Sequence, residues 1–510
     1  MRASTSNLVN DIASSVVVFL VAIPLCLGIA VASGVPVALG LISGVVGGIV
    51  VGLIAGSPLQ VSGPAAGLAV IVFGFVSEYG LAALGPVVLA AGVLQILAGF
   101  LRMGSWFRAI SPAVVHGMLA GIGILIILGQ VHVLMDASPA AGGIENVAAI
   151  DDTVDGLWSD GITNQTLALM VGVASLIAMV GWEKIRPARM KLVPGALMGV
   201  ACGTILAVAF NLPITRVELP ASMLDGIAIP GAADFARLLE PGIIISVLVI
   251  AVIASAETLL SAAAVDRMHD GVRTRYNKEL VAQGVGNGLC GMLGALPITG
   301  VIVRSSANIQ AGARTRASAV LHGVWILALV ALLPQLLGIV PLTALAAVLL
   351  VTGWRLVSLQ HVRHLFDHHG WVPVGIWFAT VSLVVTQDLL IGVGIGLALS
   401  ILEIVPHLRR KLRIEKQEEK DSIAVRLDGA ATCKDIPALI DTLDSLPAGR
   451  RVTLTAPTLQ YLDHSCAETI SDWVKRERRA GRPMDVTDMF IDSHPRVKSL
   501  FKRFNAEAMA

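Results

Sequence analysis

The stretches QVSGPAAG, at residues 60–67, and PITGVIVR, at residues 297–304, decide the fold. Each places a hydroxyl residue and a glycine directly before a short apolar run. Ser and Thr favour the first residue of a helix, and glycine lets another group approach the backbone. Each run therefore predicts a half-helix that begins inside an apolar layer. Gly63 and Gly300 lie 237 residues apart, about half of the apolar part of the chain, and such a pair indicates a transporter built from two inverted repeats.

The composition around these stretches is that of a membrane protein with a polar tail. The 510 residues are 55% hydrophobic and 14% charged, whereas globular proteins average about 25% charged residues. Of the 73 Asp, Glu, Lys and Arg residues, 35 lie in residues 409–510. This distribution excludes a disordered chain, a collagen, a disulfide scaffold and an ordinary cytosolic enzyme as descriptions of the whole chain.

The apolar part predicts a polytopic α-helical membrane domain with about fourteen spans, since a bilayer core about 30 Å thick needs roughly 20 apolar residues per helix. Two of these spans, which contain the half-helices, are too short or too interrupted to cross alone. The candidate spans are residues 12–32, 36–55, 61–77, 83–101, 113–134, 165–183, 192–210, 243–265, 279–296, 300–312, 317–337, 341–354, 371–386 and 388–406.

The basic residues indicate an orientation with both termini in the cytoplasm. Lys and Arg cluster after even-numbered spans and again at residues 409–413, after the last span. The loop at residues 136–160 is acidic and contains neither Lys nor Arg, as an outside loop should. The first apolar stretch lacks a polar, cleavage-ready end, so we expect an uncleaved insertion signal. The predicted location is the inner (plasma) membrane, crossed many times.

The composition changes sharply at the end of the last span, and the tail predicts a small cytoplasmic α/β domain. Its strands and helices are expected at residues 422–427, 434–446, 451–454 and 467–479. The basic cluster at residues 409–413 fits either a topology signal that touches lipid headgroups or a regulatory lipid site. We divide the chain into a transport domain, a juxtamembrane linker and the tail domain, at residues 1–408, 409–420 and 421–510.

Two half-helices that face each other would form an anion site. Their first N–H groups have no partner within the helix, and two positive dipole ends would meet away from water. The alternative is a pair of ordinary Gly and Pro kinks. Arg304 is the only basic residue between Lys278 and Arg314, and a charge inside a span costs about 3 kcal/mol. We expect Arg304 to supply positive potential to the site; a snorkelling or structurally paired arginine is the alternative.

Glu257 is a second charge inside an apolar stretch, the only ionisable residue from position 241 to position 265. Ser261 follows it by four residues and therefore lies on the same helical face. A carboxylate with a hydroxyl one turn away is suited to carry a proton or to bind Na⁺. The alternative is a structural ion pair between Glu257 and Arg304.

Other motifs are weaker indications of function. His364 and His368, with Asp367 and His369, have the spacing of metal ligands on a helix but no convincing third ligand. Neither G-x-x-x-x-G-K-[ST] nor H-E-x-x-H occurs, so ATP hydrolysis and zinc proteolysis lack support. We expect no metal, no cofactor, no nucleic-acid partner and no enzymatic activity.

Together, these features resemble the SulP family of anion transporters, the sulfate permease and solute-carrier-26 group. The resemblance covers nearly the whole chain. It rests on SGP at residues 62–64, NKELVAQGVGN at residues 277–287, LPITGVIVRS at residues 296–305, and a tail similar to a STAS domain.

The resemblance implies a seven-plus-seven inverted repeat, in which spans 1–4 and 8–11 form a core domain and the others a gate domain. It also implies elevator-like movement and homodimers to which the STAS-like domains contribute. The substrate would lie between half-helices 3 and 10. The substrate-binding residues that it implies are Pro24, Leu25, Ala65, Ala66, Gly67, Gly300, Val301, Ile302, Val303 and Arg304.

One position departs from the family pattern. Members that carry bicarbonate with Na⁺ resemble this chain at Glu257 and Ser261 but have a threonine where this chain has Ile302. The loss makes H⁺ more attractive as the coupling ion, although Thr299 is placed to substitute for the missing hydroxyl. We therefore expect Glu257, Ser261 and Thr299 to handle the coupling ion.

The sequence thus predicts a secondary active transporter for a small oxyanion, bicarbonate or sulfate, coupled to H⁺ or Na⁺. A C4-dicarboxylate/H⁺ symporter is a close alternative, because the small residues at 65–67 leave room for either substrate. An anion channel, or a membrane receptor that signals through the tail, belongs to a different class. Coupled, saturable uptake would distinguish a carrier from both.

Overall fold

The computed structural model describes residues 5–104, 111–158, 163–187, 190, 192–219, 227, 229–269, 271–405, 412–418, 422–447, 450–479, 481 and 484–486. The chain divides into two compact units. The first unit comprises Met1–Arg102, Leu119–Ser358 and Leu383–Leu390, and the second comprises Met103–Met118, Leu359–Ser382 and Ile391–Ala510.

Every predicted span contains a helix, as the local hydropathy requires. Within the described residues, six helical stretches are long and apolar enough to cross a membrane. They are α1 (Thr5–Ala32), α2 with η1 and α3 (Val37–Ile54), η2 with α5 (Leu81–Phe100), α7 (Pro112–Leu134), α10 (Asn164–Ile185) and α13 (Pro241–Met268). Shorter apolar helices are α4 (Ala66–Tyr79), α11 (Gly195–Ala209), α16 (Ala317–Leu332), α18 (Leu342–Val357), α20 (Trp371–Thr386) and α21 (Leu389–Ile404). The two remaining spans are α14 (Tyr276–Met292) and α15 (Ile302–Gln310).

Further helices occupy the connections between spans. They are α8 (Gly143–Ala148), α9 (Ile150–Trp158), α12 (Ala232–Ala236), α17 (Gln335–Gly338) and α19 (Leu359–His369). The acidic outside loop predicted at residues 136–160 is thus largely helical. His132, at the end of α7, joins it through hydrogen bonds with Thr153 Oγ1 (2.7 Å) and Asn146 O (2.9 Å).

The two interrupted spans begin with short strands instead of helices. Strand β1 (Ser62–Pro64) pairs antiparallel with β2 (Ile298–Gly300), and Ser62 lies opposite Gly300. Pro64 favours an extended residue before it, and the β-branched residues of β2 favour extended backbone. Each strand leads, after one linking residue, into a half-helix, α4 or α15. The sequence therefore placed the breaks correctly, and the structure brings them together.

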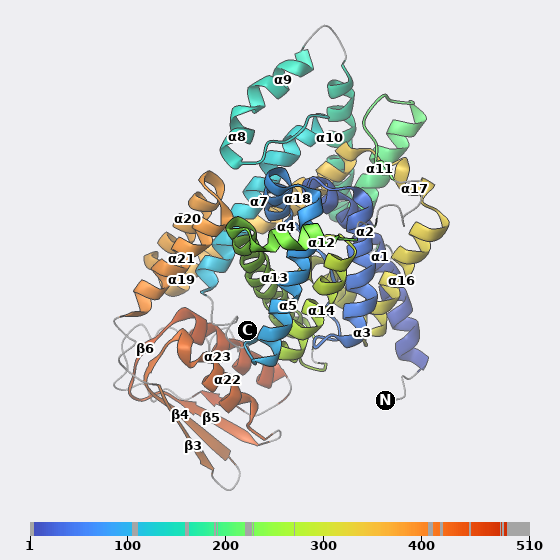
Figure 1. Cartoon of the computed structure of the whole chain (residues 1–510). Coiled ribbons are helices and arrows are strands. Elements are labelled where there is room, and N and C mark those ends of the chain that lie inside the picture. Colours follow the sequence, from blue (N-terminus) through green and yellow to red (C-terminus); the bar gives the residue numbers. More distant parts are fainter. Residues whose placement is uncertain are drawn as a thin grey trace. The chain divides into compact units, whose positions relative to one another are not determined.

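Small residues allow neighbouring elements to reach this strand pair. Helix α2 ends in a π-helical turn, η1 (Gly47–Val51), which lies against β1. A Cβ atom on Gly47 would come within 2.6 Å of the Ser62 carbonyl oxygen, so only glycine permits this approach. In Figure 1, α1, α2 and α16 lie side by side, and all three helices pack against one another.

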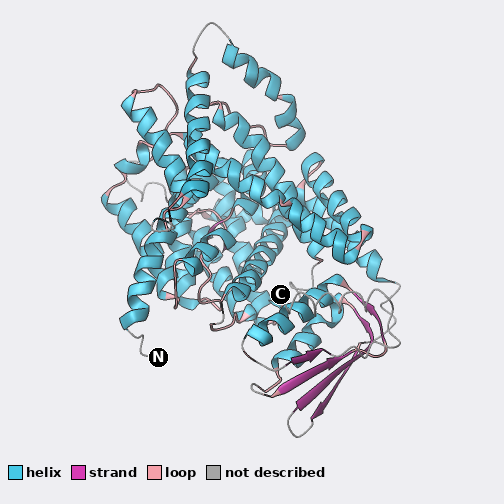
Figure 2. Ribbon diagram, turned by 180° about the vertical axis from the view of Figure 1, so that it is seen from behind, coloured by secondary structure: helices cyan, strands magenta, loops and turns pink. Residues whose placement is uncertain are grey.

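The tail forms a five-stranded sheet with two helices packed against it (Figure 2). The strand order is β3-β4-β5-β7, with β6 paired to β4; only the β3–β4 pair is antiparallel. Leu439, Ile470 and Trp473, from the helices, join Val425 and Leu454, from the sheet, in one buried core. The elements are β3 (Arg413–Glu418), β4 (Ser422–Ala431), α22 (Ile436–Asp444), β5 (Arg451–Thr455), β6 (Leu459–Leu462), α23 (His464–Arg479) and β7 (Met484–Val486).

Strand β3 corrects one predicted boundary. The linker was expected to extend over residues 409–420, but Arg413–Glu418 pairs with β4 and belongs to the tail domain. Ile414 packs against the core of this domain, whereas the charged residues of the strand are exposed. Charges on an exposed edge strand discourage pairing with another chain. An edge strand rich in charged residues therefore resembles a charged linker in composition.

Candidate functional site

The starts of the two half-helices lie next to each other. Val301, the residue before α15, donates its N–H to the Val61 carbonyl oxygen (2.9 Å). Ser305 Oγ, from the first turns of α15, accepts the Val61 N–H (2.9 Å). Together with the β1–β2 pairing, these bonds fix the N-terminus of α15 against the segment that leads into α4.

The hydroxyl residues do not cap the half-helices, contrary to the sequence prediction. Ser62 and Thr299 lie in the strands, and the helices begin at Ala66 and Ile302. The residues at the N-cap positions, Ala65 and Val301, make no side-chain hydrogen bond to the first turn. Alanine and valine are among the poorest N-caps, so the sequence leaves the first N–H groups of both helices open to another acceptor.

Arg304 lies beside these open groups and is fully buried. It is the largest of the fully buried side chains in the described part of the chain. Its Nη2 donates to Pro64 O (3.3 Å) and to Cys26 Sγ (3.5 Å), whereas its Nε and Nη1 have no hydrogen-bond partner. The guanidinium lies so close to Gly63 that a Cβ atom there would overlap Nη1. Arg304 thus reaches from one half-helix to the strand before the other.

Arg304 has no carboxylate partner within the described residues. In particular, the structure does not form the ion pair with Glu257 that the sequence left open. A buried charge without a counter-ion is strongly unfavourable, and two of its three nitrogen atoms remain unsatisfied. Its positive charge is therefore not offset by any carboxylate in the described part of the chain.

Glu257 lies on α13 beside the other half-helix. A Cβ atom on Gly67, in the first turn of α4, would lie 2.9 Å from Glu257 Oε2. Oε2 is buried and has no hydrogen-bond partner, and the Thr299 side chain lies close enough to the carboxyl group to interact with it. Ser261, one turn further along α13, is also buried. The structure thus brings Glu257 and Thr299 together, with Ser261 on the next turn.

Two polar residues that were not predicted as site residues complete the connection to α13. Thr258 Oγ1 accepts the Gly300 N–H (3.1 Å), and the Thr258 carbonyl accepts a bond from Gln60 Nε2 (3.0 Å). Gln60 is the first residue of the stretch at residues 60–67, and Thr258 follows Glu257. The signal that identifies them is a polar side chain inside an apolar stretch.

The other predicted substrate-binding residues lie around the starts of the two half-helices and differ in how far they are buried. Pro24 and Leu25 are buried on α1, which packs against β1, α4 and α15, and the next residue, Cys26, touches Arg304. Ala65 is buried, whereas Ile302 is 42% exposed. The side chains of His364, His368 and His369 lie outside the described residues.

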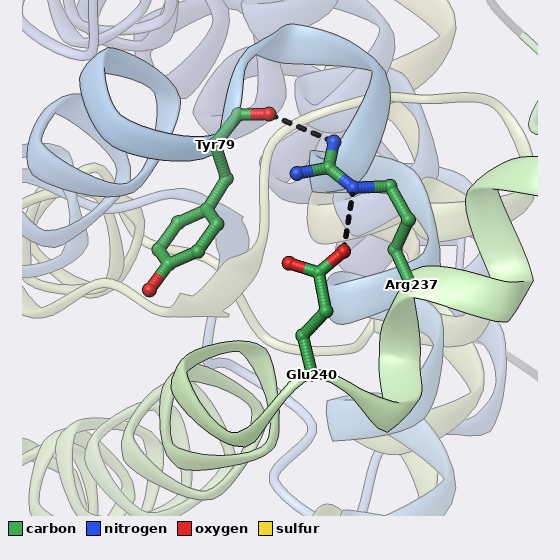
Figure 3. Close-up of polar contacts among 3 residues, drawn as sticks. All are labelled: Tyr79, Arg237 and Glu240. Atoms are coloured by element: carbon green, nitrogen blue, oxygen red, sulfur yellow. Dashed lines mark hydrogen bonds and ion pairs between the residues drawn. The ribbon is translucent and has the colours of Figure 1, made fainter.

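The far end of α4 is held by Arg237 (Figure 3). Arg237 Nη1 donates to the Tyr79 carbonyl oxygen at the C-terminus of α4 (2.9 Å), and Nε donates to Glu240 (3.1 Å). A cation at this end of a helix stabilises the helix dipole. Because Glu240 directly precedes α13, the contact also ties α4 to the helix that carries Glu257.

Comparisons with known proteins agree with this architecture. Residues 8–380 match the model of the sulfate permease family. The chain is 29% identical over 492 residues to a putative sulfate transporter, YvdB, of Bacillus subtilis, covering 92% of this chain and 89% of that one. It is 26% identical over 405 residues to the bicarbonate transporter BicA of Picosynechococcus, covering 76% and 69%. Its fold is similar to that of the murine solute carrier 26 member A9 anion transporter in the inward-facing state, with a TM-score of 0.68, 14% identity and coverage of 94% and 86%.

Proposed function

Because the chain belongs to the sulfate permease family, whose members are membrane anion transporters, we propose that it is a secondary active transporter of a small inorganic oxyanion, bicarbonate or sulfate. The observation that carries this proposal is the buried Arg304, which has no carboxylate partner among the described residues and reaches from one uncapped half-helix toward the start of the other. An oxyanion would accept bonds from the open N–H groups at residues 66–67 and 302–303 and would neutralise Arg304.

The physical basis is that of a desolvated anion site. An ion that leaves water loses its hydration, and fixed N–H dipoles replace that hydration without the cost of reorganisation. Arg304 does not need to touch the anion, because a buried charge acts over several ångströms in a low-dielectric surrounding. Backbone donors recognise charge and size more than identity, which suits a family with relatives named for sulfate and for bicarbonate.

We assign coupling to Glu257. Its carboxylate lies against Gly67 of α4, so the half-helix that would hold the anion also faces the ion-binding group. The orphaned Oε2 can take a proton or, with the Thr299 and Ser261 hydroxyls, a Na⁺ ion. Bound next to the anion, either cation would reduce the net charge that crosses the membrane, which couples the two fluxes.

The elements that form this site pack against each other. Helices α1 and α13 each contact both half-helices, and α13 also contacts β2. A cluster connected in this way is suited to move as one body, which supports an elevator-like movement.

We further propose a homodimer in the inner membrane with both termini in the cytoplasm. Multi-angle light scattering in detergent tests the oligomeric state, and reporter fusions at both termini test the topology.

The test is uptake of labelled bicarbonate, sulfate or fumarate into proteoliposomes across pH and Na⁺ gradients. We expect saturable oxyanion uptake that depends on one of the two cation gradients. Fumarate as the preferred substrate would indicate a dicarboxylate symporter instead, and an anion conductance without coupled flux would indicate a channel. Absence of uptake of all three anions would contradict the proposal.

Glu257→Gln tests the coupling role separately. The amide keeps the size of the side chain but cannot take up the coupling ion, so gradient-driven uptake should be abolished while anion binding is partly retained. The matched control is Glu240→Gln, which changes an exposed carboxylate at the start of the same helix. Normal uptake with unchanged ion dependence in Glu257→Gln would show that the coupling role is wrong.

A further inference from the structure

Helix α14 carries three buried polar side chains that the proposed mechanism does not use. Glu279, Gln283 and Asn287 follow one another at intervals of four residues, so they form one stripe along the helix. Each is at most 1% exposed. Burial of such groups is costly unless they are hydrogen-bonded, so their partners reveal their role.

The first half of the stripe holds the segment that leads into α4. Glu279 Oε2 accepts the N–H groups of Gly56 (2.7 Å) and Ser57 (2.9 Å), and its Oε1 accepts a bond from Gln283 Nε2 (3.1 Å). Gln283 Nε2 also donates to Ser62 Oγ in strand β1 (2.5 Å). The carboxylate is thereby bonded to backbone before the strand and, through Gln283, to the strand itself.

The second half of the stripe holds the other strand. Asn287 uses both ends of its amide on Ile298 of β2: Oδ1 accepts the Ile298 N–H (2.7 Å), and Nδ2 donates to the Ile298 carbonyl (3.0 Å). Nδ2 also donates to Gln95 Oε1 on α5 (2.7 Å), and Gln95 Nε2 donates to Ser255 on α13 (3.2 Å). One helix therefore binds both strands through side chains one turn apart.

We propose that this stripe is a positioning device for the anion site, in which Gln283 and Asn287 fix the relative placement of the two half-helix N-termini by holding β1 and β2 on one rigid helix. Ser62 lies three residues before Ala65, and Ile298 lies three residues before Val301. Release of either strand would therefore move the N–H groups at the start of a half-helix. The inference rests on the proposed function, because positioning matters only if those groups bind an anion.

The Gln283–Ser62 bond allows a sharp test. Ser62→Ala removes the acceptor and Gln283→Leu removes the donor, in each case without adding a charge. If Gln283 acts through Ser62, Ser62→Ala should lower anion affinity about five-fold, the effect of one ordinary hydrogen bond. Gln283→Leu should lower it at least as much, because it also loses the bond to Glu279 Oε1. The double variant should then resemble Gln283→Leu, because the Gln283–Ser62 bond cannot be removed twice. Gln335→Leu, the same substitution at an exposed position on α17, is the matched control.

Two readouts separate positioning from general stability. The first is sulfate or bicarbonate affinity from anion-induced thermal stabilisation of the full-length protein in detergent. The second is hydrogen exchange of the amides at residues 60–66 and 298–303 without anion, which should be faster in Gln283→Leu and unchanged in Gln335→Leu. Ser62→Ala, a small change, still tests the bond where Gln283→Leu fails to fold.

The outcomes distinguish the two proposals. If the unmodified protein binds anion but both single variants keep its affinity within two-fold, the positioning role is wrong and the transport proposal stands. A multiplicative loss in the double variant, or an equal loss in Gln335→Leu, would also overturn the positioning role. If the unmodified protein binds neither anion, the proposed function fails, and the exchange experiment still decides whether Gln283 holds the strand.

Discussion

Replacing Arg304 by methionine separates a binding role from a structural one, because the two roles predict opposite changes in stability. Methionine is of similar length and apolar, so it fills much of the space that the buried arginine occupies. It removes two long hydrogen bonds, to Pro64 O (3.3 Å) and Cys26 Sγ (3.5 Å), worth about 1 kcal/mol together. It also removes a buried charge without a counter-ion, whose desolvation costs several kcal/mol. The anion-free protein should therefore be as stable as before or more stable, by about 1–3 kcal/mol.

Anion binding should change in the opposite direction. Two unit charges about 6 Å apart attract each other by about 3 kcal/mol at an effective dielectric constant of about 20. Loss of this attraction corresponds to an affinity about 100-fold weaker. An anion that binds only the folded state raises the melting temperature by mass action, and most of this increase should disappear in Arg304→Met.

Thermal unfolding in detergent, with and without sulfate or bicarbonate, measures both effects in one assay. The matched control is Arg363→Met, because the Arg363 side chain is 86% exposed and far less dependent on its surroundings. A lower melting temperature without anion, combined with an unchanged response to anion, would return Arg304 to a purely structural role and refute the electrostatic argument.

Three further predictions follow from single contacts. Gly67→Ala places a methyl group 2.9 Å from Glu257 Oε2, so the carboxylate must shift. The concentration of coupling ion that half-activates uptake should therefore change several-fold. Unchanged ion dependence in uptake assays would contradict the contact. Arg237→Ala loses the bond to Tyr79 O and an exposed ion pair. The free energy of unfolding should fall by about 1 kcal/mol, measured as a slightly lower melting temperature, without a change in selectivity. Burial raises the pKa of the Asp463 carboxyl from 3.8 to about 6, so the folded tail domain binds the proton more tightly than the unfolded chain. The stability of the tail domain should therefore fall by about 3 kcal/mol as pH rises from about 4 to about 6 and then level off. Asp463→Asn keeps an oxygen that can accept the Cys466 N–H. It should abolish this pH dependence, measured by hydrogen exchange over β4 and α23.

Local composition was enough to predict the spans, the tail and the two breaks. Hydropathy is a property of consecutive residues, and each predicted span contains a helix of the structure. The unusual residues inside those spans, Arg304 and Glu257, were also visible because a charge in an apolar stretch is conspicuous by itself. Composition failed at β3, where exposed charges on an edge strand resemble those of a linker.

The sequence by itself therefore determined the membrane architecture and the candidates for the site, whereas only the tertiary structure decided how those candidates are related. It showed that Ser62 and Thr299 lie in paired strands instead of capping helices, that Arg304 has no ion pair with Glu257, and that α14 binds both strands. The physical reason is distance along the chain: the strand pair joins segments more than 230 residues apart, and no local pattern specifies which polar group a buried side chain will meet.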